Sequence, residues 1–165
     1  MNALISVNNK EGLIEFVKGL IDLGYQVYAT EGTAKFLEYA GLKVRRLSEI
    51  TGITESKELK TLHPEVFKRI YSGFFDLIVV NLYKPKEIDI GGVTLLRAGA
   101  KNYDKVLVVC DPRDYPLVLE KLESGIDDSF RLELAIKAFE YVIDYDRRVV
   151  RILKENRKYR EMNFS

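Results

Sequence analysis

The sequence is poor in the residues that disulfides and metal sites require. It contains one cysteine, Cys110, and one histidine, His63, among 165 residues. A single cysteine excludes an internal disulfide, and one cysteine with one histidine is too small a set for a structural zinc site. We therefore expect neither a disulfide framework nor a bound metal.

An excess of one charge and long apolar runs are also lacking. Lys and Arg number 26 against 25 Asp and Glu, which gives a formal net charge of +1. No broad electrostatic field therefore favours nucleic acid or an anionic membrane, and any anion must be held by local groups. No apolar stretch reaches the length of about 18 residues that marks a membrane span, and no leader pattern opens the chain. We expect a cytoplasmic protein with neither nucleic acid nor membrane as a partner.

The apolar residues of the chain are arranged in short runs. Hydrophobic residues make up 47% of the sequence, enough for the core of one domain. Helical patterns separate the short β-rich runs, and this alternation predicts an α/β fold with a central parallel sheet of about five strands. The expected strands are Ala3–Val7, Gln26–Ala29, Lys43–Leu47, Asp76–Val80 and Lys105–Val109.

Glycine and proline mark several helix ends between these runs. A helix over Thr33–Ala40 should end at Gly41, Pro64 suits the first turn of another, and Asp114 with Pro116 begins a third.

The carboxy-terminal part of the chain shows a longer pattern. Apolar residues share one helical stripe from Asp128 to Lys154, interrupted by Asp146. This helix should cover the sheet or form a subunit contact, and the polar segment from Glu155 to Ser165 is expected to be frayed. The predicted organisation is one domain over 1–165, with an α/β core over 1–125 and a helix and tail over 126–165.

Two loops after expected strands carry groups that can hold an anion. Ser6, Asn8 and Lys10 follow the first strand, and Thr30, Gly32 and Thr33 follow the second. Hydroxyl, amide and ammonium groups at a helix start either cap the helix or bind an anion there. Glu31 in the second loop would repel a phosphate unless it turns away or pairs with a cation.

The later loops add candidates for proton transfer. Lys60 is either a solvated lysine or one that transfers a proton or stabilises an oxyanion, whereas His63 before Pro64 is expected to have a structural role. Asn81 and Tyr83 alternate with Leu82, so their side chains should point the same way if the strand continues.

The stretch "DIGGVTLLRAGAKN" combines an acid at a helix head with cations further along. Asp89 is placed to interact with the exposed amides of Gly91 and Gly92. Arg97 and Lys101 share a helical stripe, which favours an anionic partner on that face. Lys101 is too far along a straight helix to pair with Asp89, so it reaches the same chemistry only through a bend or across a dimer.

Together these segments resemble a known enzyme family. "LISVNNKEGLIEF", "ATEGTAKFLEYAGL", "KTLHPEV", "VVNLY", "IDIGGVTLLRAGAKN" and "LAIKAFEYVIDYD" resemble, in order, the IMP cyclohydrolase domain of the bifunctional purine-biosynthesis protein that also carries AICAR transformylase. The resemblance covers nearly the whole chain. It implies a methylglyoxal-synthase-like three-layer α/β domain that closes the purine ring of 5-formamidoimidazole-4-carboxamide ribotide to give IMP, without metal or organic cofactor.

The resemblance also implies which residues form the site. The catalytic set would be Lys60, Tyr83, Asp89 and Lys101. The substrate-binding set would be Ser6, Asn8, Lys10, Thr30, Gly32, Thr33, Thr61, Asn81, Ile90, Gly91, Gly92 and Arg97. As implied partners, a separate AICAR formyltransferase would supply the substrate and a second copy would complete a homodimer.

The chain departs from the family pattern at several places. Glu58 stands where the family has arginine, with Lys57 as a possible substitute, and Glu31 stands where the family has glycine. Loops beside "KTLHP" and after "NLY" are shortened. Two alternatives on the same fold stay open, a nucleotide- or phosphate-sensing domain and a methylglyoxal synthase.

Overall fold

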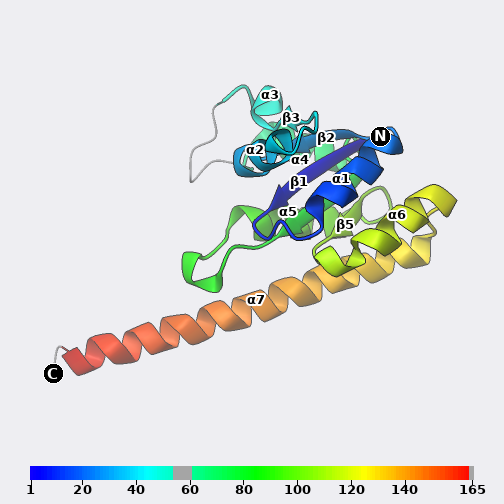
Figure 1. Ribbon diagram of the computed structural model, residues 1–165. Helices are drawn as coiled ribbons and strands as arrows, with labels where there is room; N and C mark the ends of the chain where they lie inside the picture. Colours follow the sequence, from blue (N-terminus) through cyan, green and yellow to red (C-terminus); the bar gives the residue numbers. More distant parts are fainter. Residues whose placement is uncertain (54–60, 164–165) are drawn as a thin grey trace.

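The computed structural model describes residues 1–53 and 61–163 (Figure 1). Its centre is one sheet of five parallel strands. The strands are β1 (Asn2–Val7), β2 (Gln26–Ala29), β3 (Arg45–Arg46), β4 (Leu77–Asn81) and β5 (Leu107–Val109). The predicted α/β fold with a parallel sheet of about five strands is therefore confirmed, although β3 is shorter than the run expected over Lys43–Leu47.

The strand order is β3-β2-β1-β4-β5, so β1 lies in the middle of the sheet. Ala3 of β1 is in register with Val27 of β2 on one side and with Leu77 of β4 on the other. After β1, the chain adds β2 and β3 on one side of that strand. It then crosses back and adds β4 and β5 on the other side. The order reverses between β1 and β4.

Apolar side chains leave the sheet on both faces, and helices cover each face. Ala3, Ile5 and Val7 pack into one core cluster, whereas Leu4 packs into the other. This alternation is the two-residue period of a strand, and burial on both sides is typical of parallel sheets. The helices α1 (Leu13–Asp22), α2 (Glu31–Tyr39) and α6 (Tyr115–Ser124) cover one face, and α4 (Pro64–Tyr71), α5 (Gly91–Lys101) and much of α7 (Asp128–Asn163) cover the other.

The helix ends follow the expected signals. Gly41 has φ +81°, a left-handed conformation that glycine adopts without strain, just after α2. His63 caps α4, because its Nδ1 accepts the Glu65 N–H at 3.2 Å. The structural role expected for His63 is thus confirmed. Short helical segments complete the chain at α3 (Ser48–Thr51), η1 (Pro85–Glu87) and η2 (Pro112–Asp114).

The helix α7 is the longest element, with 36 residues. Figure 1 shows it running along the domain, with its carboxy-terminal part extending beyond the other elements. The expectation of a frayed tail from Glu155 was wrong, since α7 continues to Asn163. The segment lacks glycine and proline and is rich in Lys, Arg and Glu, which have high helix propensity.

Despite its length, α7 has no apolar run that would carry it through a lipid bilayer, and the same holds for every other helix within residues 1–53 and 61–163.

Candidate functional site

The candidate site lies where the strand order reverses. Ligands of open parallel sheets bind beyond the carboxyl ends of the strands at this point. Here the end of β1 supplies Ser6 and the loop after it supplies Asn8 and Lys10, while the end of β4 supplies Asn81 and the segment after it supplies Tyr83. Residues more than 70 positions apart in sequence therefore meet at one edge of the sheet.

A small polar hollow occupies this edge, with a volume of about 210 Å³. The structure brings together there all six residues predicted for the two anion loops. It is lined by Ser6, Val7, Asn8, Lys10, Thr30, Gly32, Thr33, Asn81, Tyr83 and Asp89. Asn81 and Tyr83 both line it while Leu82 between them is buried in the core, as their alternation predicted.

Hydroxyl groups from two strands are linked across the polar hollow. Thr30 Oγ1 donates to Ser6 Oγ at 3.3 Å and lies 3.4 Å from Thr33 Oγ1. The Lys10 ammonium donates to the Val7 carbonyl and lies 3.5 Å from Thr33 Oγ1. The ammonium is thereby held beside the Thr33 hydroxyl, which Thr30 links to Ser6, an arrangement suited to an anion with several oxygens.

The first turn of α2 adds backbone donors to the same place. Thr30 is the residue before the helix, and its side chain makes no capping hydrogen bond. The N–H groups at the start of a helix have no partner within the helix, and the helix dipole favours negative charge there. A Cβ on Gly32 would meet no atom within 4 Å, so the glycine leaves open space beside these amides.

Glu31 is held by cations on the neighbouring strand β3 and on its own helix α2. Its carboxylate pairs with the Arg46 guanidinium of β3 and lies 3.3 Å from the Lys35 ammonium. Arg46 also contacts Glu38 at 2.6 Å. Arg46, with a smaller effect of Lys35, lowers the pKa of Glu31 from its ordinary value. The charge that conflicted with an anion site is therefore paired, and Glu31 does not line the polar hollow.

Asn81 fixes the position of the first loop against β4. Its Oδ1 accepts the N–H groups of Asn8 at 2.6 Å and Asn9 at 2.8 Å, and its Nδ2 donates to the Asn9 carbonyl at 2.9 Å. The side chain is 7% exposed and is used on both its oxygen and its nitrogen. Asn81 thus shapes the site by holding backbone.

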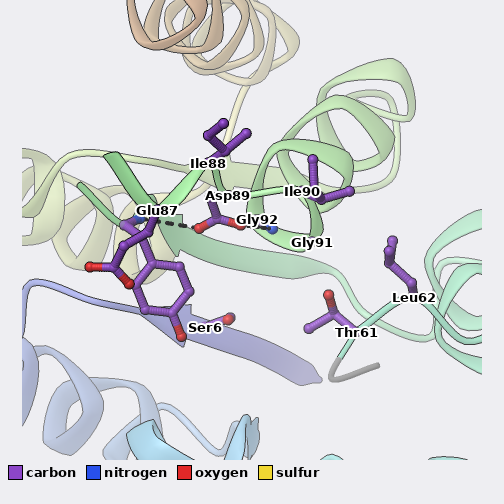
Figure 2. A pocket seen from close by; sticks show the side chains of 10 residues that line it. Ser6, Thr61, Leu62, Glu87, Ile88, Asp89, Ile90, Gly91 and Gly92 are labelled. Atoms are coloured by element: carbon purple, nitrogen blue, oxygen red, sulfur yellow. Dashed lines mark hydrogen bonds between the residues drawn. The ribbon is translucent and has the colours of Figure 1, made fainter. Parts of the chain in front are cut away.

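A larger cavity, of about 590 Å³, adjoins the polar hollow at the head of α5. The two share Ser6, Tyr83 and Asp89. We call it the α5 cavity, and it is lined by Ser6, Thr61, Leu62, Tyr83, Glu87, Ile88, Asp89, Ile90, Gly91 and Gly92. Figure 2 shows Asp89 at the head of the helix, with Thr61 and Leu62 across the cavity from Ile88.

Asp89 bonds two backbone amides at the entrance to α5. Its Oδ1 accepts the Gly92 N–H at 2.7 Å and its Oδ2 accepts the Tyr83 N–H at 3.1 Å (Figure 2). The predicted interaction of Asp89 with the amides of the glycine pair is confirmed for Gly92. The same carboxylate faces both hollows, so it is placed to accept a proton from a bound molecule.

The paired glycines allow this close packing. A Cβ on Gly91 would lie 2.6 Å from Thr61 Oγ1, and a Cβ on Gly92 would lie 2.8 Å from Asp89 Oδ2 and 2.7 Å from Leu82 Cδ2. All three distances are too short for a real Cβ. Any larger residue would displace the threonine or the carboxylate.

Two tyrosines of α7 hold the loop between β4 and α5. The Leu82 N–H donates to the Tyr141 hydroxyl at 3.1 Å, and the Asp89 N–H donates to the Tyr145 hydroxyl at 2.7 Å. Burial raises the pKa of both phenols above its ordinary value, so they stay protonated. The long helix thereby anchors both ends of the loop that carries Tyr83 and Asp89.

Three predicted residues lie elsewhere or outside the described structure. Arg97 and Lys101 line a separate hollow on α5, where Arg97 stacks on Phe139 and Lys101 on Tyr71, each 5.6 Å from the ring centre. Within one chain they do not join Asp89, and a role for them at the site stays a prediction. Lys60, like Lys57 and Glu58, lies outside the described residues.

Several residues of the site were not predicted from sequence. Leu62, Glu87 and Ile88 line the α5 cavity, and Tyr141 and Tyr145 support it from α7. Ile88 has φ +51°, an unusual conformation for a β-branched residue and one found at functional loops. No sequence pattern signals that conformation, nor which tyrosines reach the loop.

In the described part of the chain, no three His, Cys, Asp or Glu side chains come together as a metal site would require. The site instead places a corner of hydroxyl, amide and ammonium groups beside a carboxylate and a phenol. These groups can orient an anionic molecule and transfer protons to it or from it.

Comparison with known proteins defines the class to which this fold and site belong. Residues 12–106 match the family of the MGS-like domain, and the chain belongs to that family. Residues 99–165 match a second family, described as the AICARFT/IMPCHase bienzyme. The α/β domain and the long helix are thus each matched by a family.

Individual proteins show a more specific sequence similarity to this chain. The chain is 36% identical to the bifunctional purine biosynthesis protein PurH of Staphylococcus carnosus, over 94% of this chain and 38% of that protein. PurH of Staphylococcus saprophyticus is 37% identical, over 94% of this chain and 39% of that protein. The chain therefore spans about two fifths of the length of these relatives.

A solved structure matches at nearly full length. The crystal structure of ForH superposes with a TM-score of 0.81 and 32% identity, covering 91% of this chain and 97% of that chain. The alignment with the Staphylococcus carnosus protein runs over 189 positions, more than the 165 residues present here. That relative thus carries additional residues within the matched region, in keeping with the loops that the sequence showed to be short.

Proposed function

We propose that this protein is an IMP cyclohydrolase, which closes the purine ring of 5-formamidoimidazole-4-carboxamide ribotide to give IMP and water. The observation that carries the proposal is the adjacency of the two hollows, which share Ser6, Tyr83 and Asp89. A ribotide has an anionic phosphate at one end and a reacting heterocycle at the other. The polar hollow suits the phosphate and the α5 cavity suits the heterocycle.

The proposed reaction joins two groups of one molecule. The carboxamide nitrogen attacks the formyl carbon and a C–N bond forms. The bond from that carbon to the formyl oxygen then breaks, and the oxygen leaves as water with one proton from the carboxamide nitrogen and one from the formamide nitrogen. This chemistry needs positioning, proton transfer and stabilisation of charge on oxygen, and it needs no protein nucleophile. Holding the phosphate and the heterocycle in adjoining hollows supplies the positioning.

We assign the proton transfers to Asp89 and Tyr83 of the α5 cavity and to Lys60. Asp89 accepts a proton from the carboxamide nitrogen, and Tyr83 donates a hydrogen bond to the developing oxyanion. Lys60, by resemblance to the family, protonates the formyl oxygen as water leaves. Asp89 is supported by its place at both hollows and by the two amides that fix its carboxylate.

The phosphate site is supported by the pairing of Glu31. In this chain Arg46 and Lys35 neutralise the residue that departs from the family pattern. Lys10 then supplies positive charge at the polar hollow, next to the amides of α2 and the hydroxyls of Thr30 and Thr33. The departure at Glu31 is therefore compatible with an anion at this place.

The direct test is to incubate the purified protein with the formylated ribotide and to follow the absorbance of IMP, with a control that lacks protein. Ring closure well above the spontaneous rate is expected. Asp89→Asn should abolish most of this excess while nucleotide binding, measured by calorimetry, persists. Lys60→Ala should lower turnover much more than binding, and an equal loss of both would contradict its catalytic role.

The other members of this fold class define the contrary results. Tight nucleotide binding without turnover would identify a sensing domain. Formation of methylglyoxal from dihydroxyacetone phosphate would identify a methylglyoxal synthase. Either result would overturn the proposal.

We further propose that residues 1–165 act as one cyclohydrolase domain in the cytoplasm, as a homodimer. A separate AICAR formyltransferase would supply the formylated substrate. Size measurement of the purified chain, and activity measured with and without an added formyltransferase and its substrates, test these two points.

A further inference from the structure

An exposed apolar seam runs along α7. Six of its residues, Leu132, Ile136, Phe139, Ile143, Val150 and Leu153, are between 37% and 52% exposed. A neighbouring side of the same helix packs on the domain through Ala135, Ala138, Val142, Tyr145 and Val149. The helix therefore has two apolar faces, of which the chain itself covers one.

The spacing along this seam is that of a coiled coil. From Leu132 to Leu153, successive seam positions are separated alternately by four and three residues, with Asp146 at the fifth position. Such a seven-residue repeat keeps one face of a helix against a partner helix over its length. Ile136, Ile143 and Val150 occupy one set of positions, and β-branched residues are favoured there in two-stranded pairs.

Charges beside the seam are divided between its two halves. Glu133 and Glu140 flank the first half, and Arg147 and Lys154 flank the second half, each seven residues from the next. All four side chains are exposed, and none forms an ion pair within the described residues. One half of the edge is acidic and the other half is basic.

This division of charge identifies the partner as a second, antiparallel copy of the same helix. In a parallel pair, these four residues would lie beside Ala135, Val142 and Val149 of the second helix, so no charge would meet an opposite charge. In an antiparallel pair, the acidic half of each helix lies along the basic half of the other. Oppositely charged residues beside a coiled-coil seam set partner choice and orientation.

We propose that two copies of this chain dimerise through an antiparallel contact between their α7 seams. Glu140 lies opposite Arg147 of the second copy, and Glu133 lies opposite Lys154 of the second copy. In this register Ile136 packs against Leu153 and Phe139 against Val150, while Ile143 and Asp146 face each other beside the two-fold axis. The interface is isologous and closes on itself.

The surface around the seam has room for this partner. A hollow of about 560 Å³ lies beside Leu132 and Ile136, and another of about 380 Å³ lies beside Phe139, bordered by Arg97 and Lys101. The carboxy-terminal part of α7 extends past the domain (Figure 1). In the antiparallel pair, this extended part of each copy lies along the hollows of the other.

The test measures the mass of the full chain by sedimentation velocity and light scattering. The wild type should have twice the 19.0 kDa mass of one chain. Glu140→Arg or Arg147→Glu places like charges opposite each other at two symmetric points, so each should weaken the dimer by about tenfold. Arg151→Glu makes the same charge change away from the seam and should leave the mass unchanged.

Recombining the charges decides the orientation. The double variant Glu140→Arg with Arg147→Glu should dimerise like the wild type. An equimolar mixture of the two single variants should also form a mixed dimer, because each chain then offers the charge that the other requires. Failure of both restorations would exclude the antiparallel register and overturn the proposal.

A separate variant tests the apolar part of the seam. Ile143→Lys should give a monomer with an unchanged circular dichroism spectrum, since this side chain is exposed in the single chain. A monomeric wild type would overturn the proposal, and so would a dimer that withstands Ile143→Lys. These results do not depend on whether the protein closes the purine ring.

Discussion

Gly92 and Gly32 both border the candidate site, but their surroundings differ. We expect Gly92→Ala to destabilise the protein by about 1–3 kcal/mol, because an added methyl group overpacks against Leu82 and the Asp89 carboxylate. The displaced carboxylate should also lower the rate of ring closure. Chemical denaturation and the IMP assay measure the two effects.

Gly32→Ala provides the matched control for the same chemical change. Its methyl group enters open space within the first turn of α2, so stability should rise by about 0.5 kcal/mol. If the polar hollow holds the phosphate, the nucleotide should nevertheless bind more weakly. A Gly32→Ala protein with unchanged affinity would place the phosphate elsewhere.

Individual site residues could be predicted where the signal is local. Ser6 lies at the end of a strand and Thr30 and Thr33 follow one. Because strands of a parallel sheet end at a common edge, their meeting follows from the order of the elements. The partner of Glu31 could not be found in this way, because Arg46 comes from another strand and its choice depends on the packing of β3 beside α2. Lys101 shows the reverse case, a residue on the expected helix that lies apart from Asp89 within one chain.

The loop between β4 and α5 depends on α7 for its position. Tyr145→Phe removes the hydroxyl that accepts the Asp89 N–H. An amide left without its partner costs about 1–3 kcal/mol when buried, and this one is partly buried, so we expect a loss near the lower value. Turnover should fall by about tenfold while KM changes little, because Asp89 moves but the polar hollow does not.

Tyr39→Phe makes the same change on a side chain that is 96% exposed, and it should alter neither stability nor turnover. The kcat and KM values of both variants, together with their unfolding free energies, test the role of Tyr145. An equal rise in KM for Tyr145→Phe would show that the helix supports the whole site and not the acid in particular.

The bounds of a helix or strand were predicted correctly where the pattern of apolar residues is strong. The run Gln26–Ala29 is a strand with the bounds that were expected. β3 is shorter than expected, because only Arg45 and Arg46 pair with β2. Whether a residue joins a strand depends on its packing against the neighbouring strand, which its own sequence does not show. α7 is longer, because continued helix needs only residues with good propensity and no breaker.

A charge cluster joins α7 to the segment after β5 and contributes to how the whole molecule responds to acid. Arg113 is the main cause that holds the pKa of Asp111 well below its usual range, and Lys137 of α7 adds to the effect. The Lys137 ammonium also lies 2.7 Å from Asp114. Because the folded-state pKa is depressed, the stability from Asp111 is complete above the ordinary Asp pKa of about 3.9 and is lost as pH falls through the lower value.

We therefore expect the unfolding free energy of the wild type to decline below about pH 4. Asp111→Asn should be less stable at pH 7 and should show a shallower decline in acid, as followed by urea unfolding across this pH range. Asp104→Asn serves as the control, since Asp104 is exposed and forms no ion pair within the described residues, and its pH profile should match the wild type.

The central place of β1 has a consequence for how the chain acquires its structure. β1 is made before the other strands of the sheet, yet its second edge pairs with β4, whose residues follow more than 70 positions later. Until then a row of N–H and C=O groups on β1 has no neighbour, and such edges invite pairing with other chains. Contacts between distant segments also slow folding, because a long loop must close first. The central strand of the finished sheet is thus the one whose edge stays unpaired longest, and the nascent chain must keep that edge from pairing with other chains.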